Sequence, residues 1–370
     1  MVTATRPTLA AIETLLRNGY WDRTEVIRMA DASLRVRKQS KGQESNGPWG
    51  QDNLRAEANY IEELEPHLLD LFPRLIASWE NPAPGYDMAY MAGFVDVAQL
   101  ARSSSLNQHQ ADAFQNQLGK RVFGQLHTPC DPTAALANNV LTTLQQAAQL
   151  IETSDALRLL AQDQLLINGQ PCSSLSKNIT ALKTQTHIFK DLEKAPQVRL
   201  HGDLFLENIL LPQAPDTADV ESNPHWPTQL MLIDPVSVAG MSMGHPLFDL
   251  AKYESYACGE LPAMRRGHMV VTGFDQPSEE TNNFSFAINW QAKEMEVFNK
   301  VNWHQSLRQS YVSHYGAIDR TINDTNDEAL YALLEAYFAA AMVLCTNGVE
   351  HQARALKAIL SLQNAVDLSL

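Results

Sequence analysis

The sequence predicts an α+β fold with a small first part, residues 1–93, and a larger, mainly helical second part, residues 94–370. Short apolar runs bounded by turn residues, with one helical pattern among them, fill the chain up to Gly93. From Val95 onward, apolar residues recur with the period of a helix. Two short apolar runs interrupt this helical part, and carboxylate side chains follow each of them. At 370 residues, the chain is long enough for two hydrophobic cores.

The first part is expected to be a small sheet that carries one helix. Thr8 is suited to cap a short amphipathic helix that ends at Asn18-Gly19, and Asp52 starts a second helix with apolar residues on one face. A polar, Gly-containing loop precedes that second helix. The expected strands are residues 25–29, 33–38, 73–79 and 86–91, and the loop is residues 40–51.

The second part is expected to consist of helices with two short strands between them. The expected helices are residues 106–127, 132–154, 175–193 and 246–258, with several more toward the C-terminus. The two strands are residues 198–200 and 229–233. The stretch between the strands, residues 212–227, is rich in Pro, Asp and Asn and is typical of a surface insertion.

Composition narrows the class of protein and its partners. The net charge is −14 and no run of Lys and Arg forms a basic stripe, which argues against a nucleic-acid partner. The longest apolar run, residues 336–345, is too short to span a bilayer, so no membrane partner is expected. The four cysteines lie far apart and the N-terminus lacks an apolar signal segment, which favours reduced thiols and a cytoplasmic location. The oligomeric state cannot be deduced from these features.

The segment R-L-H-G-D-L-F-L-E-N-I-L, residues 199–210, carries the chemistry. A strand ends just before it, and a loop then presents Asp203 and, five positions later, Asn208. Phosphoryl transfer needs a carboxylate that accepts the proton of the attacking hydroxyl, and oxygen ligands for Mg²⁺. A second apolar strand ends on Asp234 in M-L-I-D-P. A hairpin of the two strands would bring Asp234 beside Asn208 as an Asp/Asn metal pair.

These motifs resemble the aminoglycoside phosphotransferase and choline kinase family. The resemblance rests on H-G-D-x-x-x-x-N, on the following I-D, and on G-x-x-x-x-D-L-A from Gly244 to Ala251. It implies a two-lobed protein-kinase-like fold, with residues 1–93 as the N-lobe and 94–370 as the C-lobe. By this resemblance Asp203 is the catalytic base, Asn208 and Asp234 hold Mg²⁺, and ATP is the phosphoryl donor.

Upstream, the resemblance covers the nucleotide-binding elements. Residues 88–93, including Ala89 and Met91, fall where the family has its interlobe hinge, whose backbone would bond the adenine. Lys38 would contact the phosphates, held by Glu57 from the following helix. Strand alternation leaves Arg37 as the alternative, because whichever side chain faces the cleft takes the role.

Further downstream, the resemblance gives two residues structural roles. Asp249 would buttress the catalytic loop from the next helix. His201 is expected to be part of the scaffold of that loop and not a base.

Two departures from protein kinases bear on function. Asp249 follows Asp234 by 15 positions, which leaves no room for a long peptide-docking segment and disfavours a protein substrate. Residues 20–41 contain no glycine, so no Gly-rich loop is expected there; Ala30, Ala32 and Ser33 would supply a small-residue substitute that covers the phosphates.

The sequence therefore predicts an ATP- and Mg²⁺-dependent phosphotransferase that acts on a hydroxyl of a small molecule such as a sugar, aminosugar or amino alcohol. The missing glycines motivate an alternative, a nucleotide-binding pseudokinase with a regulatory or scaffolding role. The complete set of Asp203, Asn208 and Asp234 favours the enzyme.

Overall fold

The computed structural model describes residues 6–19, 21–41, 50–103, 106–131, 135–194, 196–213, 227, 229–236, 240–275, 284–291, 298, 300–316 and 325–369. Contacts divide the chain into two units. The first unit is Met1–Ser103 with His201–Ser242, and the second is Ser104–Leu200 with Met243–Leu370. This grouping follows packing and does not test the lobe boundary predicted at Gly93, which stays a prediction.

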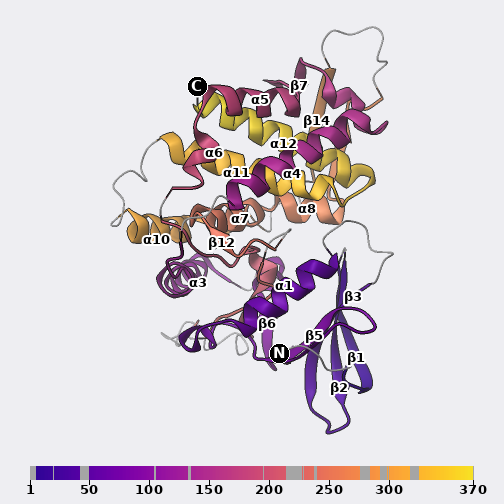
Figure 1. Ribbon diagram of the computed structural model, residues 1–370, viewed down its shortest axis with the longest axis vertical. Helices are drawn as coiled ribbons and strands as arrows, with labels where there is room; N and C mark the ends of the chain where they lie inside the picture. The colour runs from indigo at the N-terminus through magenta and orange to yellow at the C-terminus, as the bar shows by residue number, and fades with distance from the viewer. Residues whose placement is uncertain are drawn as a thin grey trace. The chain divides into compact units, whose positions relative to one another are not determined.

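The first unit contains a five-stranded antiparallel sheet that carries the helix α1 (Figure 1). The strand order β1-β2-β3-β5-β4 makes the first three strands a meander. The strands are β1 (Leu9–Asn18), β2 (Asp22–Met29), β3 (Leu34–Ser40), β4 (Leu75–Trp79) and β5 (Gly85–Ala89), and the helix is α1 (Gly50–Glu62), followed by the short turn η1 (Pro66–Leu68). The predicted strands at 25–29, 33–38, 73–79 and 86–91 and the helix from Asp52 are confirmed, with shifted ends.

The helix predicted from Thr8 to Gly19 is wrong, because β1 occupies these residues. It pairs antiparallel with β2 from Leu9↔Met29 to Asn18↔Arg23. A ten-residue helix is marginal unless its apolar face is buried, and here Ile12 stays 52% exposed. Pairing with β2 satisfies the backbone instead, so non-local hydrogen bonds override the local helical pattern. The first hairpin turn therefore lies between Asn18 and Asp22.

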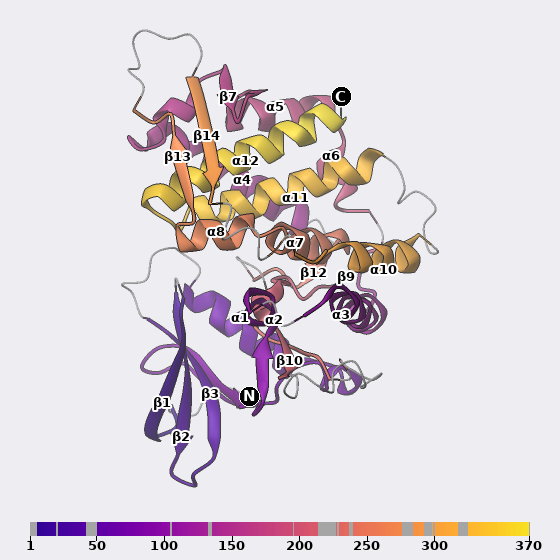
Figure 2. The ribbon, with the colours of Figure 1, turned by 180° about the vertical axis from the view of Figure 1, so that it is seen from behind.

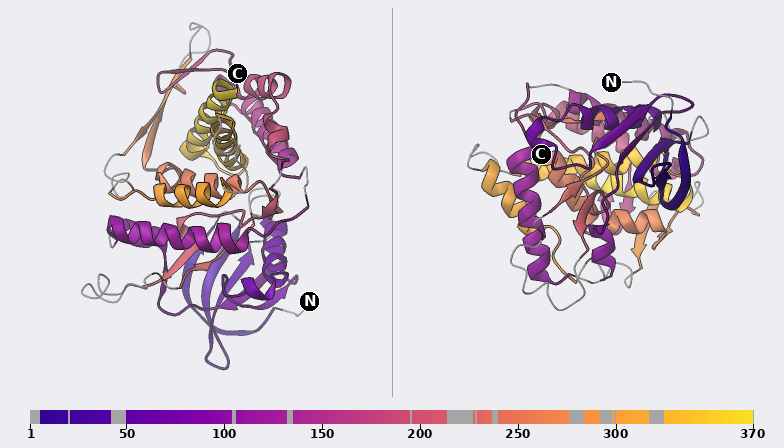
Figure 3. Two further views of the ribbon diagram at one scale, coloured as in Figure 1. Left: turned by 90° about the vertical axis from the view of Figure 1, so that its left-hand side faces the viewer. Right: turned by 90° about the horizontal axis from the view of Figure 1, so that it is seen from below.

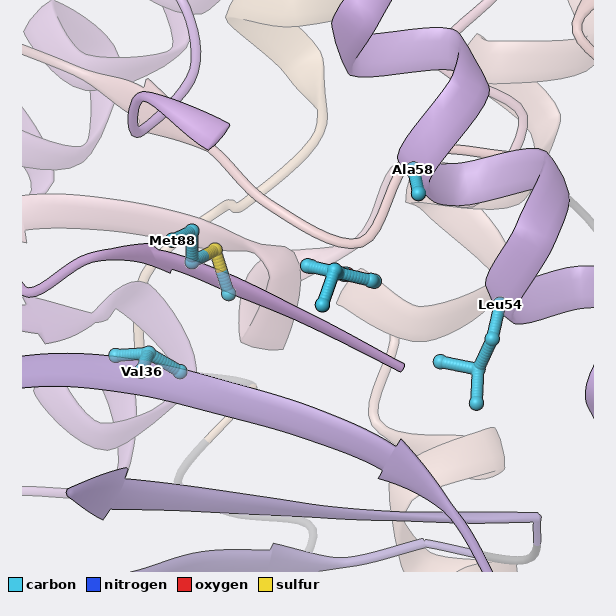
Figure 4. Close-up of a cluster of buried hydrophobic side chains, with 5 residues drawn as sticks. Val36, Leu54, Ala58 and Met88 are labelled. Atoms are coloured by element: carbon cyan, nitrogen blue, oxygen red, sulfur yellow. The ribbon is translucent and has the colours of Figure 1, made fainter. Parts of the chain in front are cut away.

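A small apolar core joins α1 to the sheet (Figure 4). Leu54 and Ala58, one helical turn apart, face Val36 of β3 and Met88 of β5. All four side chains are buried, and each stabilises the unit by about 1.5–3 kcal/mol at most, less for alanine. This packing fixes α1 across the sheet and sets which face of β3 its polar residues meet.

A three-stranded sheet, order β11-β10-β6, completes the first unit. Its strands are β6 (Phe94–Asp96), β10 (Ile209–Pro212) and β11 (Met231–Leu232), with the helix α2 (Val97–Arg102) and the turn η4 (Leu206–Asn208) beside them. The predicted hairpin is confirmed, since Ile209 pairs with Leu232. Most of the insertion predicted at residues 212–227 lies outside the described residues.

The second unit is built mainly of helices, as predicted. In Figure 2 the long helices α11 and α12 lie side by side, and in Figure 3 α3 and α10 run next to each other. The elements are α3 (Gln108–Arg121), the π-turn η2 (Val122–Leu126), α4 (Ala135–Thr153), η3 (Arg158–Ala161), α5 (Leu175–Gln185), α6 (Ile188–Asp191), α7 (Leu247–Ala257), α8 (Glu260–Arg266), α10 (Gln305–Tyr315), α11 (Thr325–Val343) and α12 (Gly348–Ser369). None of the helices among the described residues has the length and apolarity needed to cross a membrane.

The second unit also holds strands that the sequence prediction missed. A four-stranded sheet has the order β13-β14-β7-β8, and the predicted strand at 198–200 pairs as β9 with β12. The strands are β7 (Leu165–Ile167), β8 (Gln170–Cys172), β9 (Val198–Arg199), β12 (Met243–Gly244), β13 (Met269–Thr272) and β14 (Phe284–Trp290). Asn168-Gly169 between β7 and β8 has positive φ at both residues, and this dipeptide is a strong hairpin signal in the sequence. The four cysteines are free thiols, as expected.

Candidate active site

The loop that presents Asp203 is held by its neighbours in the first unit. Gly202 has φ +83, a left-handed conformation that glycine adopts without steric cost. The backbone N–H of Asp203 donates to Nδ1 of His201 at 3.2 Å. The ring of His201 is fully buried and stacks on Phe72 with centroids 6.0 Å apart, and its carbonyl accepts from the N–H of Val236. His201 is thus placed to support the loop.

Asn208 ties the two ends of the loop together. The turn η4 points its side chain back, so that Nδ2 donates to the backbone carbonyl of Asp203 at 2.9 Å and to its carboxylate at 3.0 Å. Asn208 is fully buried. Its amide nitrogen is therefore used to orient Asp203, and its oxygen Oδ1 faces the other way, toward a cation described below.

Asp234 lies next to Asn208 because β10 and β11 pair. The N–H of Ile233 donates to the carbonyl of Asn208 at 3.0 Å, and Asp234 follows with φ +52. Such a conformation is uncommon for a residue other than glycine and costs on the order of 1 kcal/mol or more, which the surrounding hydrogen bonds must offset. The structure thus places Asp203, Asn208 and Asp234 in one cluster, as the sequence predicts.

Lys38 meets this cluster from β3. Its Nζ lies 2.7 Å from Oε2 of Glu57, 3.2 Å from Oδ1 of Asp234 and 3.6 Å from Oδ2 of Asp22. Burial alone would lower the pKa of Lys38, but Asp234 and Glu57 raise it well above its usual value, so the ammonium stays charged. Burial alone would also raise the pKa of Asp234, yet nearby cations, Lys38 first, hold it below its usual range.

Glu57 is positioned by a residue that the sequence did not single out. Tyr86 is the cross-strand neighbour of Lys38 on β5, and its hydroxyl donates to Oε2 of Glu57 at 2.8 Å. Both side chains are buried. Glu57, on α1, therefore accepts hydrogen bonds from two neighbouring strands of the sheet, from Lys38 on β3 and from Tyr86 on β5.

Arg37 does not join this cluster. Adjacent residues of a strand point to opposite faces, and Arg37 forms two hydrogen bonds with Asp87, 2.8 and 2.9 Å long, on the other face of the sheet. The guanidinium also lies over Trp79 at 4.9 Å. Since Val36 and Lys38 face α1 together, the phase of the strand places Lys38, and not Arg37, beside Glu57 and Asp234.

Ser33 and its small neighbours are also absent from the cluster. Ser33 lies in the β2–β3 turn and bonds to Asp31 through both its N–H and its hydroxyl. Along the paired strands Thr24 faces Lys38, whereas Arg28 faces Leu34, so this turn is at the opposite end of the strands. The turn beside Lys38 is the one between β1 and β2, so Ser33 lies away from Lys38, and its contact with the phosphates stays a prediction.

The β1–β2 turn supplies candidate residues that sequence reasoning missed. Arg17, near the end of β1, forms an ion pair with Asp234 at 3.0 Å. Asp22 starts β2 and contacts Lys38. Gly19 lies between them, and a Cβ there would come within 2.9 Å of the Asp22 side chain. These residues were hidden by the incorrect helix assignment. The signal that would have found them is Asn18-Gly19 as a hairpin turn.

The hinge segment is partly accounted for. Ala89 is the last residue of β5, where its N–H donates to Arg74, and the carbonyl of Met91 accepts from Phe94 in a tight turn. Met88 belongs to the apolar core, whereas Tyr90 is 39% exposed. The predicted adenine contacts of Ala89 and Met91 stay a prediction.

Asp249 lies in the second unit, on α7. Its carboxylate bonds to Nε2 of His127 at 3.0 Å, and Nδ1 of that ring lies 2.6 Å from the hydroxyl of Tyr315. Both His127 and Asp249 are buried, and Tyr315 packs against them. This network fixes α7 against α10 and η2, in keeping with a structural place for Asp249.

The donor set of the first unit fits a hard divalent cation. Oδ1 of Asn208 and Oδ2 of Asp234 both point at the guanidinium of Arg17, so the two oxygens converge on one positively charged group. Oxygen ligands of this kind suit Mg²⁺, which takes its remaining ligands from water and phosphates. Within the described ranges, no cluster of three or more His, Cys, Asp or Glu side chains forms a complete metal site of its own.

Comparison with known proteins gives structural matches only. No protein-family model and no curated protein matches the chain. Among solved structures, a provisionally assigned fructosamine-3-kinase from Thermobifida fusca is 15% identical, covers 98% of this chain and 95% of its own, and has a TM-score of 0.50. A choline kinase from Cryptosporidium parvum (12% identity, 96% and 90% coverage, TM-score 0.46) and a glucosamine kinase (13%, 97% and 94%, TM-score 0.43) are also similar. The chain thus has a protein-kinase-like fold, with a β-sheet N-lobe and a helical C-lobe.

Proposed function

We propose that the chain is an ATP-dependent phosphotransferase that moves the γ-phosphoryl group of ATP to a hydroxyl of a small molecule. One observation carries the proposal: Lys38, paired with Glu57, meets Asp234, Asn208 and Asp203 in a single cluster. Phosphoryl transfer needs these groups and little else, because catalysis is mainly positioning and charge stabilisation.

Asp203 is the base in this proposal. Its carboxylate accepts the proton of the attacking hydroxyl while the oxygen of that hydroxyl forms the new bond to phosphorus and ADP leaves. The Nδ2 donor of Asn208 holds one carboxylate oxygen of Asp203 and so restricts the rotation of the side chain.

Asn208 and Asp234 would hold Mg²⁺, and Lys38 would contact the phosphates. When bound, Mg²⁺ neutralises charge on the phosphate oxygens. Lys38 stays protonated in its buried position and Glu57 keeps its Nζ in place, so the cation is ready before the nucleotide binds. The β1–β2 turn with Gly19 would cover the phosphates, because it lies at the Lys38 end of the strands.

The acceptor class we propose is a sugar, aminosugar or amino alcohol. The similarity to the fructosamine-3-kinase structure supports a sugar-derived acceptor, and the 15 positions between Asp234 and Asp249 leave little room for docking a peptide. The absence of a basic stripe in the sequence argues against nucleic acid, and the dispersed cysteines favour a cytoplasmic location.

A pseudokinase is the alternative, but the observation that favoured it is now weaker. It rested on the lack of glycine in residues 20–41, whereas the hairpin turn beside Lys38 begins one residue earlier, with Gly19. A non-catalytic module has no need for Asp203, Asn208 and Asp234 together.

The test is ADP release from MgATP across a panel of sugars, aminosugars and amino alcohols. Asp203→Asn keeps the size of the side chain but removes the base, and we expect turnover to fall about a hundredfold to ten-thousandfold. Asp155→Asn, at an exposed position of the second unit, is the matched control and keeps full turnover. Calorimetry should show unchanged MgATP binding in both variants. Undiminished turnover in Asp203→Asn contradicts the base assignment, and nucleotide binding without transfer to any acceptor favours the pseudokinase.

A further inference from the structure

The guanidinium of Arg17 stands where the two candidate metal ligands converge. Its Nη1 lies 3.0 Å from Oδ2 of Asp234, and its two terminal nitrogens lie 3.5 and 3.4 Å from Oδ1 of Asn208. A third contact goes to the backbone carbonyl of Glu207 at 3.5 Å. The side chain thus bridges the same oxygens that a divalent cation would bind.

We propose that Arg17 is a built-in competitor of the metal: in the metal-free protein its guanidinium takes the place of the cation between Asn208 and Asp234, and metal binding displaces it. The inference rests on the proposed function insofar as Asn208 and Asp234 are the metal ligands. It concerns a residue of β1 for which the phosphoryl-transfer chemistry itself has no need.

Charge balance explains why a cation is kept at this place. Lys38 lies between Glu57 and Oδ1 of Asp234, and it leaves Oδ2 of Asp234 facing the site. The ammonium of Lys38 is shared with Glu57 and Asp22, so a second cation beside the buried Asp234 is favourable. Arg17 supplies it at 3.0 Å.

Exposure explains why this cation can be exchanged. The side chain of Arg17 is 28% exposed, whereas the structural Arg37 is fully buried. A partly hydrated guanidinium loses little when its carboxylate is taken by another cation, because water and the phosphates of a nucleotide can receive it. Arg17 also precedes the Asn18-Gly19 turn directly, so displacement of its side chain would release the β1–β2 turn from Asp234.

The test uses Mn²⁺ alone, without nucleotide or acceptor, and measures its binding by electron paramagnetic resonance. We expect Arg17→Gln to bind Mn²⁺ about tenfold more tightly than the unmodified chain, since both the competitor and its positive charge are gone. Arg17→Lys keeps the charge but loses the planar fork that bridges two oxygens, so an intermediate gain is expected. Arg28→Gln is the matched control: it removes an exposed arginine of the same hairpin, paired with Glu13, and should leave Mn²⁺ binding unchanged.

Four outcomes separate this inference from the proposed function. An Arg17→Gln gain that exceeds the Arg28→Gln change supports the competitor. If Arg17→Gln binds Mn²⁺ no more tightly than the unmodified chain, Arg17 is not a competitor of the metal. If Asp234→Asn loses Mn²⁺ binding in the same experiment, the assignment of Asp234 as a metal ligand is still supported. A gain in Arg17→Gln with none in Arg17→Lys reduces the effect to charge and overturns the bridging role. Equal Mn²⁺ affinity of Asp234→Asn and the unmodified chain overturns the metal site and the competitor together.

Discussion

Arg37 and Lys38 are adjacent on one strand, yet their side chains lie on opposite faces of the sheet and have different surroundings. Arg37 is fully buried and forms an ion pair with Asp87 of the neighbouring strand. Its guanidinium lies over the ring of Trp79. Lys38 is almost as buried but lies among Glu57, Asp234 and Asp22, so carboxylates outnumber it. On one face a single arginine pairs with Asp87, whereas on the other face three carboxylates share Lys38 and the partly exposed Arg17.

The difference shows that burial and charge do not identify a functional cation. A buried pair joined by two hydrogen bonds, such as Arg37–Asp87, is expected to fix the structure, because either partner alone would be a costly buried charge. A lysine shared by several carboxylates, one of them near Asn208 and Arg17, is suited to a ligand that carries its own charges.

Substituting the two cations separately should separate stability from activity. Arg37→Met removes the hydrogen-bonded partner of the buried Asp87 and leaves it the Arg35 guanidinium at 4.0 Å, so we expect the free energy of unfolding to fall by about 3 kcal/mol, measured by denaturant titration. Lys38→Met should lower turnover by about a hundredfold or more, because a cation aimed at the transferred charge is lost. Turnover is compared per folded molecule. If Arg37→Met abolishes the turnover of the folded fraction and Lys38→Met does not, the assignment of the two faces is wrong.

His245 is a buried titratable group whose charged form a nearby carboxylate, Asp191, stabilises only in part. Burial lowers the pKa of His245 from 6.5 to about 4, and Asp191 opposes this only in part. Between pH 6.5 and about pH 4, His245 is protonated in the unfolded chain but neutral in the folded chain. The free energy of unfolding therefore falls as the pH falls through this window. The loss attributable to His245 is expected to reach about 3 kcal/mol.

The variant that tests this is His245→Asn. An asparagine oxygen can replace Nδ1, which accepts from the N–H of Leu247 at 3.3 Å, without titrating. Denaturant titrations at pH 7 and pH 4.5 should show a smaller stability loss in the variant than in the unmodified chain. The control His109→Asn, at an exposed position, should keep the full loss. An equal pH dependence in His245→Asn and the unmodified chain would exclude His245 as the cause.

A small effect is expected at Tyr86, whose hydroxyl helps to position Glu57, the partner of Lys38. Tyr86→Phe removes one hydrogen bond to Glu57 but leaves the Lys38–Glu57 pair, so we expect a loss of about 1 kcal/mol in stability. Turnover should fall less than tenfold. A loss of turnover as large as that of Lys38→Met would mean that the hydroxyl acts directly on the ligand and not through Glu57.

The sequence predicted the part of the site that depends on short-range structure. Asp203 and Asn208 share one loop, and Asp234 follows a strand that can pair only with the strand after Asn208. Local spacing and one hairpin therefore suffice to bring the three together. Glu57 was also expected on the helix that follows β3, because the family resemblance places the partner of the cation there.

The sequence could not predict what depends on distant pairing. Arg17 and Asp22 reach the site only because β1 is a strand, and its own residues favour a helix. The choice of Lys38 over Arg37 depends on the phase of β3, which the packing of Val36 decides. The parallel pairing of β7 with β14 joins segments more than a hundred residues apart, so no local sequence pattern predicts it.

Phosphorus NMR of MgATP with the acceptor panel follows the transfer of the γ-phosphoryl group itself. For the unmodified chain we expect the γ-phosphate resonance of ATP to decrease while a phosphomonoester resonance of the acceptor appears at the same rate. In Asp203→Asn, both changes should slow by at least a hundredfold. Transfer that persists undiminished in Asp203→Asn, or ATP that stays intact with every acceptor although it binds, would contradict the account.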